Sequence, residues 1–322
     1  MPRAVACYRE FAPCEALRKH VRVFFSFTPP PEKNPRRHPI TREVLFGEDD
    51  SFCSPLFADG QVSIGFSLGR TCHVDGLWHP NPPGPHGEVI GAMSTVGPAP
   101  LGELPEMVGV YFHPAQASPF THVPACELTD RIVALEDLWG AAGSELPAEL
   151  SDANTEAARI DRLESALLGR FAEGRGSTVV LDVPGLAVWV LRRRGLLTVE
   201  CLADAAGVSR QHLTRVFREG VGVTPKLYCR LARFQAGLAY AGCGKNVDWA
   251  QAAVEMGYAD QSHMIAEFRE FSSLTPRTLA TQRWFHPFIE RARPEPSCAG
   301  LSDPQLQARK TYPQRYVCPV QQ

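Results

Sequence analysis

The sequence predicts a multidomain α+β protein, with a β-rich N-terminal domain closed by two helices and an all-α C-terminal domain. Of the 28 prolines, 18 fall in the first 124 residues, whereas only Pro225 and Pro276 lie between 186 and 286. Because proline lacks a backbone donor and breaks helix interiors, the first part cannot be mainly helical and the later part can. The 322-residue length and the content of 44% hydrophobic and 21% charged residues are those of a globular protein with two domains.

Two segments of the N-terminal part have the pattern of strands. Residues 62–68 alternate apolar and small side chains, and residues 107–112 form a short apolar run that ends at His113-Pro114. Between them, the prolines and glycines of residues 79–87 predict a loop. Residues 65–69 read Gly-Phe-Ser-Leu-Gly, which fits the hydrolase pattern GxSxG, but a nucleophile elbow needs a helix directly after its strand. Residues 70–76 look extended, so we predict a strand or turn and no hydrolase site.

Two helices are predicted to close the first domain. Apolar residues recur at helical spacing through 127–139, at Leu128, Ile132, Leu135 and Leu138, and the same habit returns in residues 157–171. Residues 173–177 are small and polar, as in a linker. We therefore expect a first domain over 1–175, a linker over 176–185, a second domain over 186–290 and a poorly ordered tail over 291–322.

An internal repeat dominates the second domain. The segment Ala203-x-x-x-Gly207 recurs as Ala253-x-x-x-Gly257, and beyond the turn the two copies keep a constant offset of 51 residues. The equivalent positions are Ser209 and Asp260, Leu213 and Met264, Phe217 and Phe268, and Thr224-Pro225 and Thr275-Pro276. Agreement over several residue types indicates a duplicated structural unit.

Each copy has the features of a helix-turn-helix. Gly207 and Gly257 stand where a tight turn needs positive φ, and Ser209 and Asp260 are suited to cap the following helix. The residues spaced i, i+4 on that helix predict a buried face, which leaves a polar face for the major groove. A helical bundle with a solvated polar face is the alternative for one such pattern, and the second copy in phase disfavours it.

Charge supports a nucleic-acid partner for the second domain only. Residues 186–286 contain 13 Lys and Arg against 8 Asp and Glu, so this segment carries +5 and the rest of the chain −7, although the formal total is −2. On the polar face of the first copy, Arg215 has the donors to read guanine, while Gln211 or Gln261 fits adenine. Arg210 and Arg218 are better suited to phosphate contacts.

The segment from 186 to 283 resembles the C-terminal DNA-binding domain of the AraC/XylS transcription regulators. The resemblance rests on Leu202-Ala203-x-x-x-Gly207-Val208-Ser209-x-x-x-Leu213-x-x-x-Phe217 and on Gly257-Tyr258-x-Asp260-Gln261-Ser262-His263-x-x-x-x-Phe268-x-x-x-x-x-Leu274-Thr275-Pro276. It implies seven helices in two units, joined by a long helix for which residues 224–241 are the candidate. The two units would engage adjacent major-groove segments, about 34 Å apart.

The resemblance also implies roles by position. The residues implied to read bases are Gln211, Thr214, Arg215, Gln261, Ser262 and His263. Those implied to contact phosphates are Arg210, Arg218 and Arg269. Where many relatives carry a basic residue in the second recognition helix, this chain has Ala266 followed by Glu267. We therefore expect the second unit to contribute more to placement on the backbone, and the first unit more to sequence specificity.

Residues 127–140 resemble a stretch of AraC-type regulators that have a small β-rich N-terminal domain. This resemblance implies a cupin-like sensor fold that binds an unknown small-molecule effector, with a helix that packs on the domain or forms a homodimer contact. The implied partners are double-stranded promoter DNA and, for an activator, RNA polymerase. No cofactor is expected.

Histidines and cysteines predict no metal or reactive site. The spacing of His73, His79 and His86 is not that of a zinc module, so we expect solvated or structural side chains. His113 stands where it would line a ligand pocket or cap a strand, and capping is preferred. None of the ten cysteines forms a CxxC pair, which favours buried small hydrophobes in a reducing cytosol. Cys126 has no basic neighbour in sequence before Arg131, which favours an inert thiol.

Two other functions compete with a one-component bacterial transcription regulator. One is a DNA-repair alkyltransferase fused to an AraC-type domain, with Cys72 or Cys126 as acceptor, but the chain lacks a compact four-cysteine cluster and a Pro-Cys-His motif. The other is a helical interaction scaffold. We expect no enzyme activity. Because no run of about 18 apolar residues and no signal sequence occur, we expect a cytoplasmic protein without a membrane partner.

Overall fold

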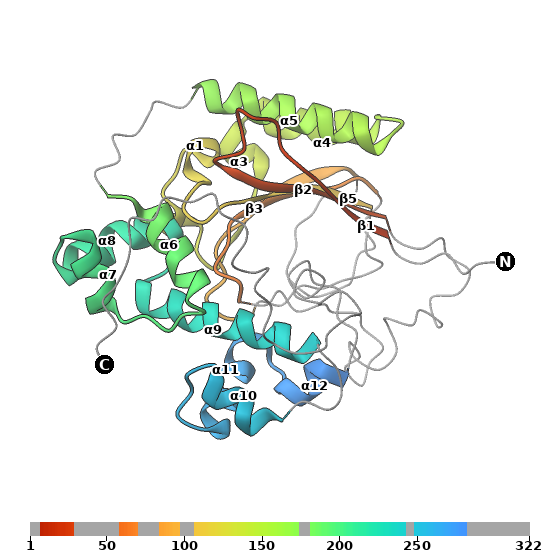
Figure 1. Ribbon diagram of the computed structural model, residues 1–322. Coiled ribbons are helices and arrows are strands. Elements are labelled where there is room, and N and C mark those ends of the chain that lie inside the picture. The colour runs from red at the N-terminus through yellow and green to blue at the C-terminus, as the bar shows by residue number, and fades with distance from the viewer. Residues whose placement is uncertain are drawn as a thin grey trace.

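The computed structural model describes residues 7–28, 58–69, 84–96, 106–173, 181–242 and 248–281. An N-terminal antiparallel β-sheet region with its own helices is followed by a helical C-terminal domain, which confirms the predicted fold class (Figure 1). The tail predicted over 291–322 and residues 176–180 of the predicted linker lie outside the described residues. The first helix of the C-terminal domain begins at Val183, inside the segment expected as linker.

The N-terminal sheet has six strands in the order β1-β2-β5-β3-β4-β6, and every neighbouring pair is antiparallel. The strands are β1 (Cys7–Phe11), β2 (Val21–Thr28), β3 (Ser63–Ser67), β4 (His86–Ile90), β5 (Met107–Phe112) and β6 (Ile132–Ala134). The strands predicted at 62–68 and 107–112 are confirmed by β3 and β5, which pair with each other in the middle of the sheet. The Gly-Phe-Ser-Leu-Gly pattern therefore lies in and just after a strand, as predicted.

The loop predicted over 79–87 is wrong for its last two residues. Strand β4 begins at His86, because residues 86–90 find hydrogen-bonding partners along β3, with Ser67 opposite His86 and Ser63 opposite Ile90. Pro85 is the last proline of this stretch, and Gly87 is paired within the strand, opposite Phe66. Residues 79–83 lie outside the described ranges.

The single helix predicted over 127–139 is also wrong. The structure divides this stretch into α2 (Ala125–Leu128), β6 and α3 (Leu135–Trp139). Asp130 has φ 56°, which a helix interior does not tolerate, and Ile132 then pairs with Ile90 at the open edge of β4. The available sheet edge outweighed the helical spacing of the apolar residues.

Helices cover one face of the sheet. Helix α4 (Ala141–Ser151) lies against α5 (Glu156–Glu173), and α1 (Ser118–Thr121) contacts α5 near the end of β5 (Figure 1). Helix α5 confirms the helix predicted over 157–171. Alternate residues of the strands fill the core beneath these helices. Fully buried members of this core are Phe24, Ile64, Phe66, Val89, Val110, Leu163 and Leu167.

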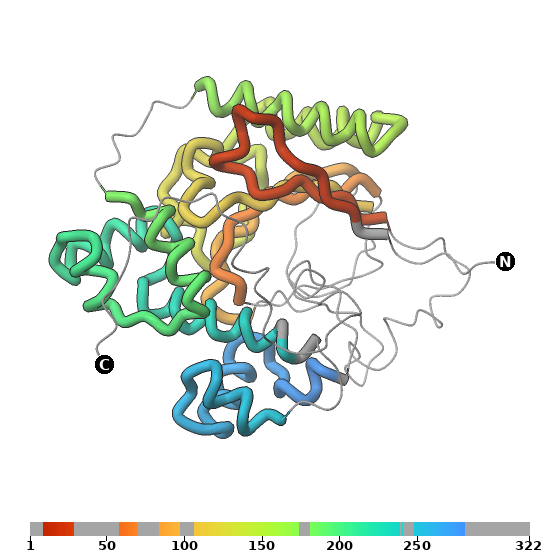
Figure 2. The backbone as a smooth tube through the Cα atoms, in the orientation of Figure 1, coloured from red at the N-terminus to blue at the C-terminus, as the bar shows by residue number. Residues whose placement is uncertain are grey.

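The C-terminal domain has seven helices within the described residues, as the resemblance implies. They are α6 (Val183–Arg192), α7 (Val199–Ala206), α8 (Arg210–Val221), α9 (Pro225–Gly242), α10 (Trp249–Glu255), α11 (Gln261–Ser272) and α12 (Pro276–Thr281). The backbone trace shows α9 between the α6–α8 group and the α10–α12 group, so it is the long connecting helix expected at 224–241 (Figure 2). In the described ranges, no helix combines the length and the apolar character needed to cross a bilayer.

The two domains are in direct contact. The backbone N–H of Ala58 donates to the carbonyl oxygen of Phe271 in α11 at 3.1 Å, and Gln235 Nε2 of α9 donates to the carbonyl oxygen of Asp59 at 2.7 Å. On the other side, Thr129 Oγ1 donates to the carbonyl oxygen of Gly222 at 2.7 Å, just after α8. The N-terminal domain therefore touches α9 and the C-terminal ends of both α8 and α11.

We predict that Asp59→Asn removes a pH-dependent loss of folding stability at this contact. Burial of the Asp59 carboxyl group raises its pKa to about 7, despite a backbone hydrogen bond and the nearby Arg22. The unfolded chain loses this proton near pH 4, so the folded state loses stability as pH rises from about 4 to about 7. Thermal unfolding is measured from pH 4 to pH 8. The midpoint temperature of the wild type minus that of the variant should fall as the pH rises over that window. A pH-independent difference would contradict the prediction.

Candidate nucleic-acid interface

Both helix-turn-helix copies form the same local structure. Gly207 ends α7 at φ 66°, and Gly257 takes φ 74° between α10 and α11. Ser209 then caps α8, accepting a hydrogen bond from the backbone N–H of His212 at 3.2 Å. Asp260 caps α11 in the same way, through the N–H of His263 at 2.7 Å. The positive φ and the caps place the second helix of each unit at a fixed angle to the first.

The apolar positions of the repeat fix which face of each second helix is buried. Leu213 and Phe217 of α8 are fully buried, and the Phe217 ring lies 5.5 Å from that of Tyr228 on α9. In α11, Met264 and Phe268 are fully buried, and the ring of Phe268 lies 5.0 Å from that of Phe234. The opposite faces of α8 and α11 are therefore left toward solvent.

The exposed face of α8 borders an open hollow of about 820 Å³. The hollow gathers all five residues of α8 to which base or phosphate contacts were assigned. Its lining residues are Cys126, Val199, Glu200, Arg210, Gln211, Thr214, Arg215, Arg218, Glu219 and Thr224. Three arginines on one side of a single helix suit duplex DNA, while Glu200 and Glu219 in the same lining reduce the net charge of the hollow to +1.

The polar side chains of this face are held by short-range contacts. Arg215 Nη1 donates to Glu219 Oε1 at 3.0 Å, one helical turn away, and Arg210 Nη1 donates to Glu200 Oε1 at 2.8 Å. A backbone hydrogen bond and the contact with Arg210 lower the pKa of Glu200. Thr214 Oγ1 donates to the carbonyl oxygen of Arg210 at 2.7 Å, so its hydroxyl hydrogen is used within the helix. Exposed pairs of this kind are weak and can be exchanged for DNA contacts.

The second unit presents a smaller polar face. Gln261, Ser262 and His263 are exposed in the first turn of α11, and the His263 ring meets that of Tyr258 edge-on at 5.4 Å. Arg269 is exposed in the last turn, and Ala266 between them offers only a methyl group. The second unit thus presents one arginine where the first presents three, and its lesser role in sequence reading stays a prediction.

Glu267, which follows Ala266 on α11, does not belong to this polar face. Only 2% of Glu267 is exposed, and its carboxylate faces α9, where it accepts a hydrogen bond from Arg230. Its negative charge is therefore neutralised inside the domain and does not oppose DNA on the surface. A 3.6-residue period places position 267 at the boundary of the two faces, which is why the sequence pattern did not resolve it.

Two features of the hollow were not predicted from the sequence. Cys126 of α2 lines it together with Arg210 and Arg218, although these residues lie more than 80 positions away in sequence. The carboxylate of Glu219 was also missed, and here a signal existed, because Glu219 stands four residues after Arg215 on one helix. The proximity of Cys126 depends on the packing of the two domains and has no local sequence signal.

Away from the hollow, the expected burial of the cysteines holds for Cys229, whereas Cys14 and Cys201 are only half-buried. His86 Nδ1 lies 3.1 Å from the carbonyl oxygen of Gly84. Burial lowers the pKa of His113, with Arg22 adding to the effect, and its backbone N–H donates to the carbonyl oxygen of His20. No group of three or more His, Cys, Asp or Glu suited to a metal occurs in the part of the chain that the structure describes. His73, His79 and Cys72 lie outside that part.

Comparisons with known proteins agree with this reading of the C-terminal domain. Residues 202–282 match a family described as a helix-turn-helix domain, and residues 9–134 match a domain of unknown function, DUF6597. No curated protein sequence matches the chain.

Solved structures to which the chain shows some similarity include ToxT from Vibrio cholerae. One, at 11% identity and a TM-score of 0.43, covers 75% of this chain and 96% of that chain. Another, unsaturated fatty acid bound wild-type ToxT from strain SCE256, has 12% identity, a TM-score of 0.43, and coverage of 74% and 92%. Similarity at this level establishes no functional correspondence.

We predict that Asp260→Ala destabilises the second unit by about 1 kcal/mol, because it removes the acceptor that caps α11. Asp260→Asn keeps an acceptor oxygen and should retain most of that stability. Urea unfolding followed by circular dichroism measures both, and Ser209→Ala gives the matched loss in the first unit. Equal destabilisation by Ala and Asn at 260 would show that capping is not what Asp260 contributes.

Proposed function

Because this chain is a DNA-binding transcription regulator with an AraC-type helix-turn-helix domain, we propose that α8 and α11 insert into adjacent major-groove segments of promoter DNA. In this proposal, Gln211, Thr214 and Arg215 of the first unit read most of the sequence. Gln261, Ser262 and His263 make the base contacts of the second unit. The phosphate contacts are assigned to Arg210, Arg218 and Arg269.

The gathering of the α8 side chains around one open hollow is the observation that carries this proposal. Arg215 and Gln211 lie on the N-terminal half of the helix, the half that reaches base edges when a recognition helix enters the major groove. Arg218, one turn nearer the C-terminus, borders the same hollow, where it is placed to meet the backbone. A merely solvated helix face would not require three arginines on one side.

We further propose that the N-terminal domain binds a small-molecule effector on the sheet face opposite α4 and α5. Ser63, Gly65 and Ser67 of β3 alternate with the core residues and therefore lie on that face, where both serines are buried. Ser67 Oγ has no hydrogen-bond partner among the described residues, and buried hydroxyl groups normally have one. Small residues and a buried hydroxyl group on one face of the sheet suit the floor of a ligand pocket. A cupin-like fold would complete that pocket.

The same proposal includes a homodimer, so that two copies could bind repeated operator segments, and contact with RNA polymerase for an activator. We place this regulator in the bacterial cytoplasm, where its DNA target lies. Analytical ultracentrifugation with and without operator DNA measures the oligomeric state.

The test of DNA reading is Arg215→Ala, with Glu219→Gln as its matched control on the same helix. Operator duplexes are first selected from a random pool with the full chain. Loss of a bidentate guanine contact should weaken binding by about 1–3 kcal/mol, or roughly 5-fold to 100-fold, and relax the preference at one base pair. Glu219→Gln removes a carboxylate near the phosphates and should leave binding unchanged or tighter. Fluorescence anisotropy measures both.

Salt dependence tests whether phosphate contacts contribute to the binding of DNA. Affinity should fall on the order of tenfold or more between about 50 and 200 mM salt, because phosphate contacts release counterions. If no duplex binds at about 50 mM salt, or if Arg215→Ala leaves affinity and base preference unchanged, the proposed reading by α8 is wrong.

The effector is sought by thermal shift of the full chain against a panel of metabolites. A ligand at 100 times its dissociation constant stabilises the state it binds by about 2.7 kcal/mol, which is well within reach of the method. Ser67→Ala should reduce the shift for a ligand that uses this hydroxyl. A full shift with Ser67→Ala would place the ligand elsewhere.

A further inference from the structure

Glu267 is a buried acidic residue on a recognition helix. Its exposure is 2%, the lowest of any charged residue in the described core. Acidic side chains are almost never fully buried unless they are paired, because taking a carboxylate out of water costs several kcal/mol. The structure of its surroundings must therefore compensate this charge.

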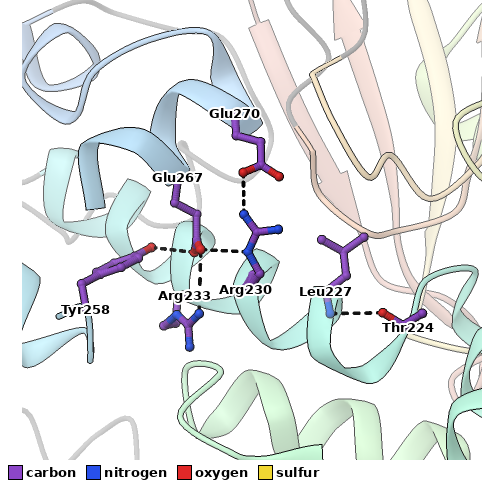
Figure 3. Close-up of polar contacts among 7 residues, drawn as sticks. All are labelled: Thr224, Leu227, Arg230, Arg233, Tyr258, Glu267 and Glu270. Atoms are coloured by element: carbon purple, nitrogen blue, oxygen red, sulfur yellow. Dashed lines mark hydrogen bonds and ion pairs between the residues drawn. The ribbon is translucent and has the colours of Figure 1, made fainter. Parts of the chain in front are cut away.

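Three side chains do so, from α9 and from the turn before α11 (Figure 3). Arg230 Nε donates to Glu267 Oε2 at 2.9 Å, Arg233 Nη2 lies 3.8 Å from the same oxygen, and Tyr258 Oη donates to Glu267 Oε1 at 3.2 Å. Burial and the Glu267 charge raise the pKa of Tyr258, so its hydroxyl stays protonated and remains a donor. We call these four residues the Glu267 clamp.

The arginines of the clamp are themselves fixed in position. Arg230 Nη2 also donates to Glu270 Oε2 at 2.5 Å, and its guanidinium lies 4.8 Å from the centre of the Phe271 ring. Contacts with Glu270 and Glu267 raise the pKa of Arg230 in spite of its partial burial. The Arg233 guanidinium lies 5.5 Å from the centre of the Tyr258 ring. One arginine thus bridges two carboxylates one turn apart on α11, which a compact ammonium group would not do.

Apolar packing alone leaves α11 less strictly placed on α9. The Phe268 ring packs on the helix beside Gly237, where an added Cβ would come within 2.4 Å of it. Such contacts favour close approach, but they are not directional, whereas hydrogen bonds to a buried carboxylate have one good geometry. The clamp therefore fixes the rotation and the height of α11 along α9.

The first unit has no equivalent of this network. At the constant offset of 51, Val216 occupies the position of Glu267, and Val208 follows the turn glycine where Tyr258 does in the second unit. The first unit is held on α9 by apolar contacts such as that between Phe217 and Tyr228. A helix-turn-helix of this type thus folds without a buried ion network, which indicates a role for the clamp other than local folding.

We propose that the Glu267 clamp sets the spacing at which this protein accepts its two DNA segments. The proposal rests on the proposed function, in which both α8 and α11 enter the major groove. One added base pair moves the second segment by about 3.4 Å and turns it by about 35° around the duplex. A clamp that holds α11 at one height and rotation on α9 makes the second unit miss such a displaced segment. Glu267 is a positioning residue in this scheme and does not touch DNA.

The test measures spacing preference with the full chain. Duplexes selected by the wild type are rebuilt with one or two base pairs added or removed between the two contacted segments, and binding is followed by fluorescence anisotropy. We expect the wild type to lose about tenfold or more for a change of one base pair. Glu267→Gln, Tyr258→Phe and Arg230→Lys should narrow this ratio to about threefold or less.

Two controls separate a change in spacing preference from a general effect on the second helix-turn-helix or on the first unit. Glu270→Gln neutralises the exposed partner of Arg230 but keeps an acceptor oxygen for it, and exposed pairs contribute little, so the spacing profile should stay that of the wild type. In each clamp variant, a base substitution in the segment bound by α8 should cost as much as in the wild type, which shows that the first unit is intact. Circular dichroism confirms folding, and Tyr258→Phe, which removes one hydroxyl from the network, keeps the test valid if Glu267→Gln unfolds.

The proposal is overturned if the folded clamp variants keep the wild-type spacing profile. It is also overturned if they lose affinity by one factor at every spacing, since that is the result of a structural role alone. Failure of the proposed function looks different, because the wild type itself would then select no sequence from the random pool. A wild type that selects one continuous segment would leave α8 reading intact and overturn the clamp proposal only.

Discussion

Helix α9 is the common surface on which both helix-turn-helix units and part of the N-terminal domain are packed. Its residues Tyr228, Leu231, Phe234 and Leu238 are at most 2% exposed, so almost every apolar position is covered by a neighbour. At about 1.5 Å per residue, its 18 residues span roughly 27 Å, somewhat less than the rise of about 34 Å of one DNA turn. The length of one helix, and the angles at which two others attach to it, thus decide where two recognition helices can meet a duplex.

The N-terminal domain shares these attachment points. Residues 58 and 59 bond to α11 and α9, while Thr129 bonds to the residue that follows α8. A ligand changes DNA binding only if it interacts differently with two arrangements of the protein. The N-terminal domain contacts the ends of both recognition helices. A change in that domain therefore reaches both helices directly, without a series of intermediate residues.

Sequence repetition predicted the C-terminal domain well, because each unit is specified by local rules. Turn glycines, cap residues and i, i+4 apolar pairs act within about 15 residues of one another. A single amino-acid sequence is therefore enough to recognise them. The N-terminal sheet was predicted only in part, since β4 and β6 form where a partner strand offers its edge. Residues 132–134 have helical spacing and still become a strand. Likewise, the burial of Glu267 depends on Arg230, 37 positions earlier, and no local pattern announces it.

The arrangement of acidic residues explains how a chain with a net charge of −2 presents a DNA-binding surface. Of the acidic residues in the basic C-terminal segment, Glu267 and Glu270 bond to α9, while Glu200 and Glu219 pair with arginines of α8. An exposed pair such as Arg215 with Glu219 is worth only about 0.3–0.5 kcal/mol, whereas a bidentate guanine contact is worth about 1–3 kcal/mol. In the proposed reading, a guanine contact by Arg215 would therefore outweigh the pair with Glu219 and displace it.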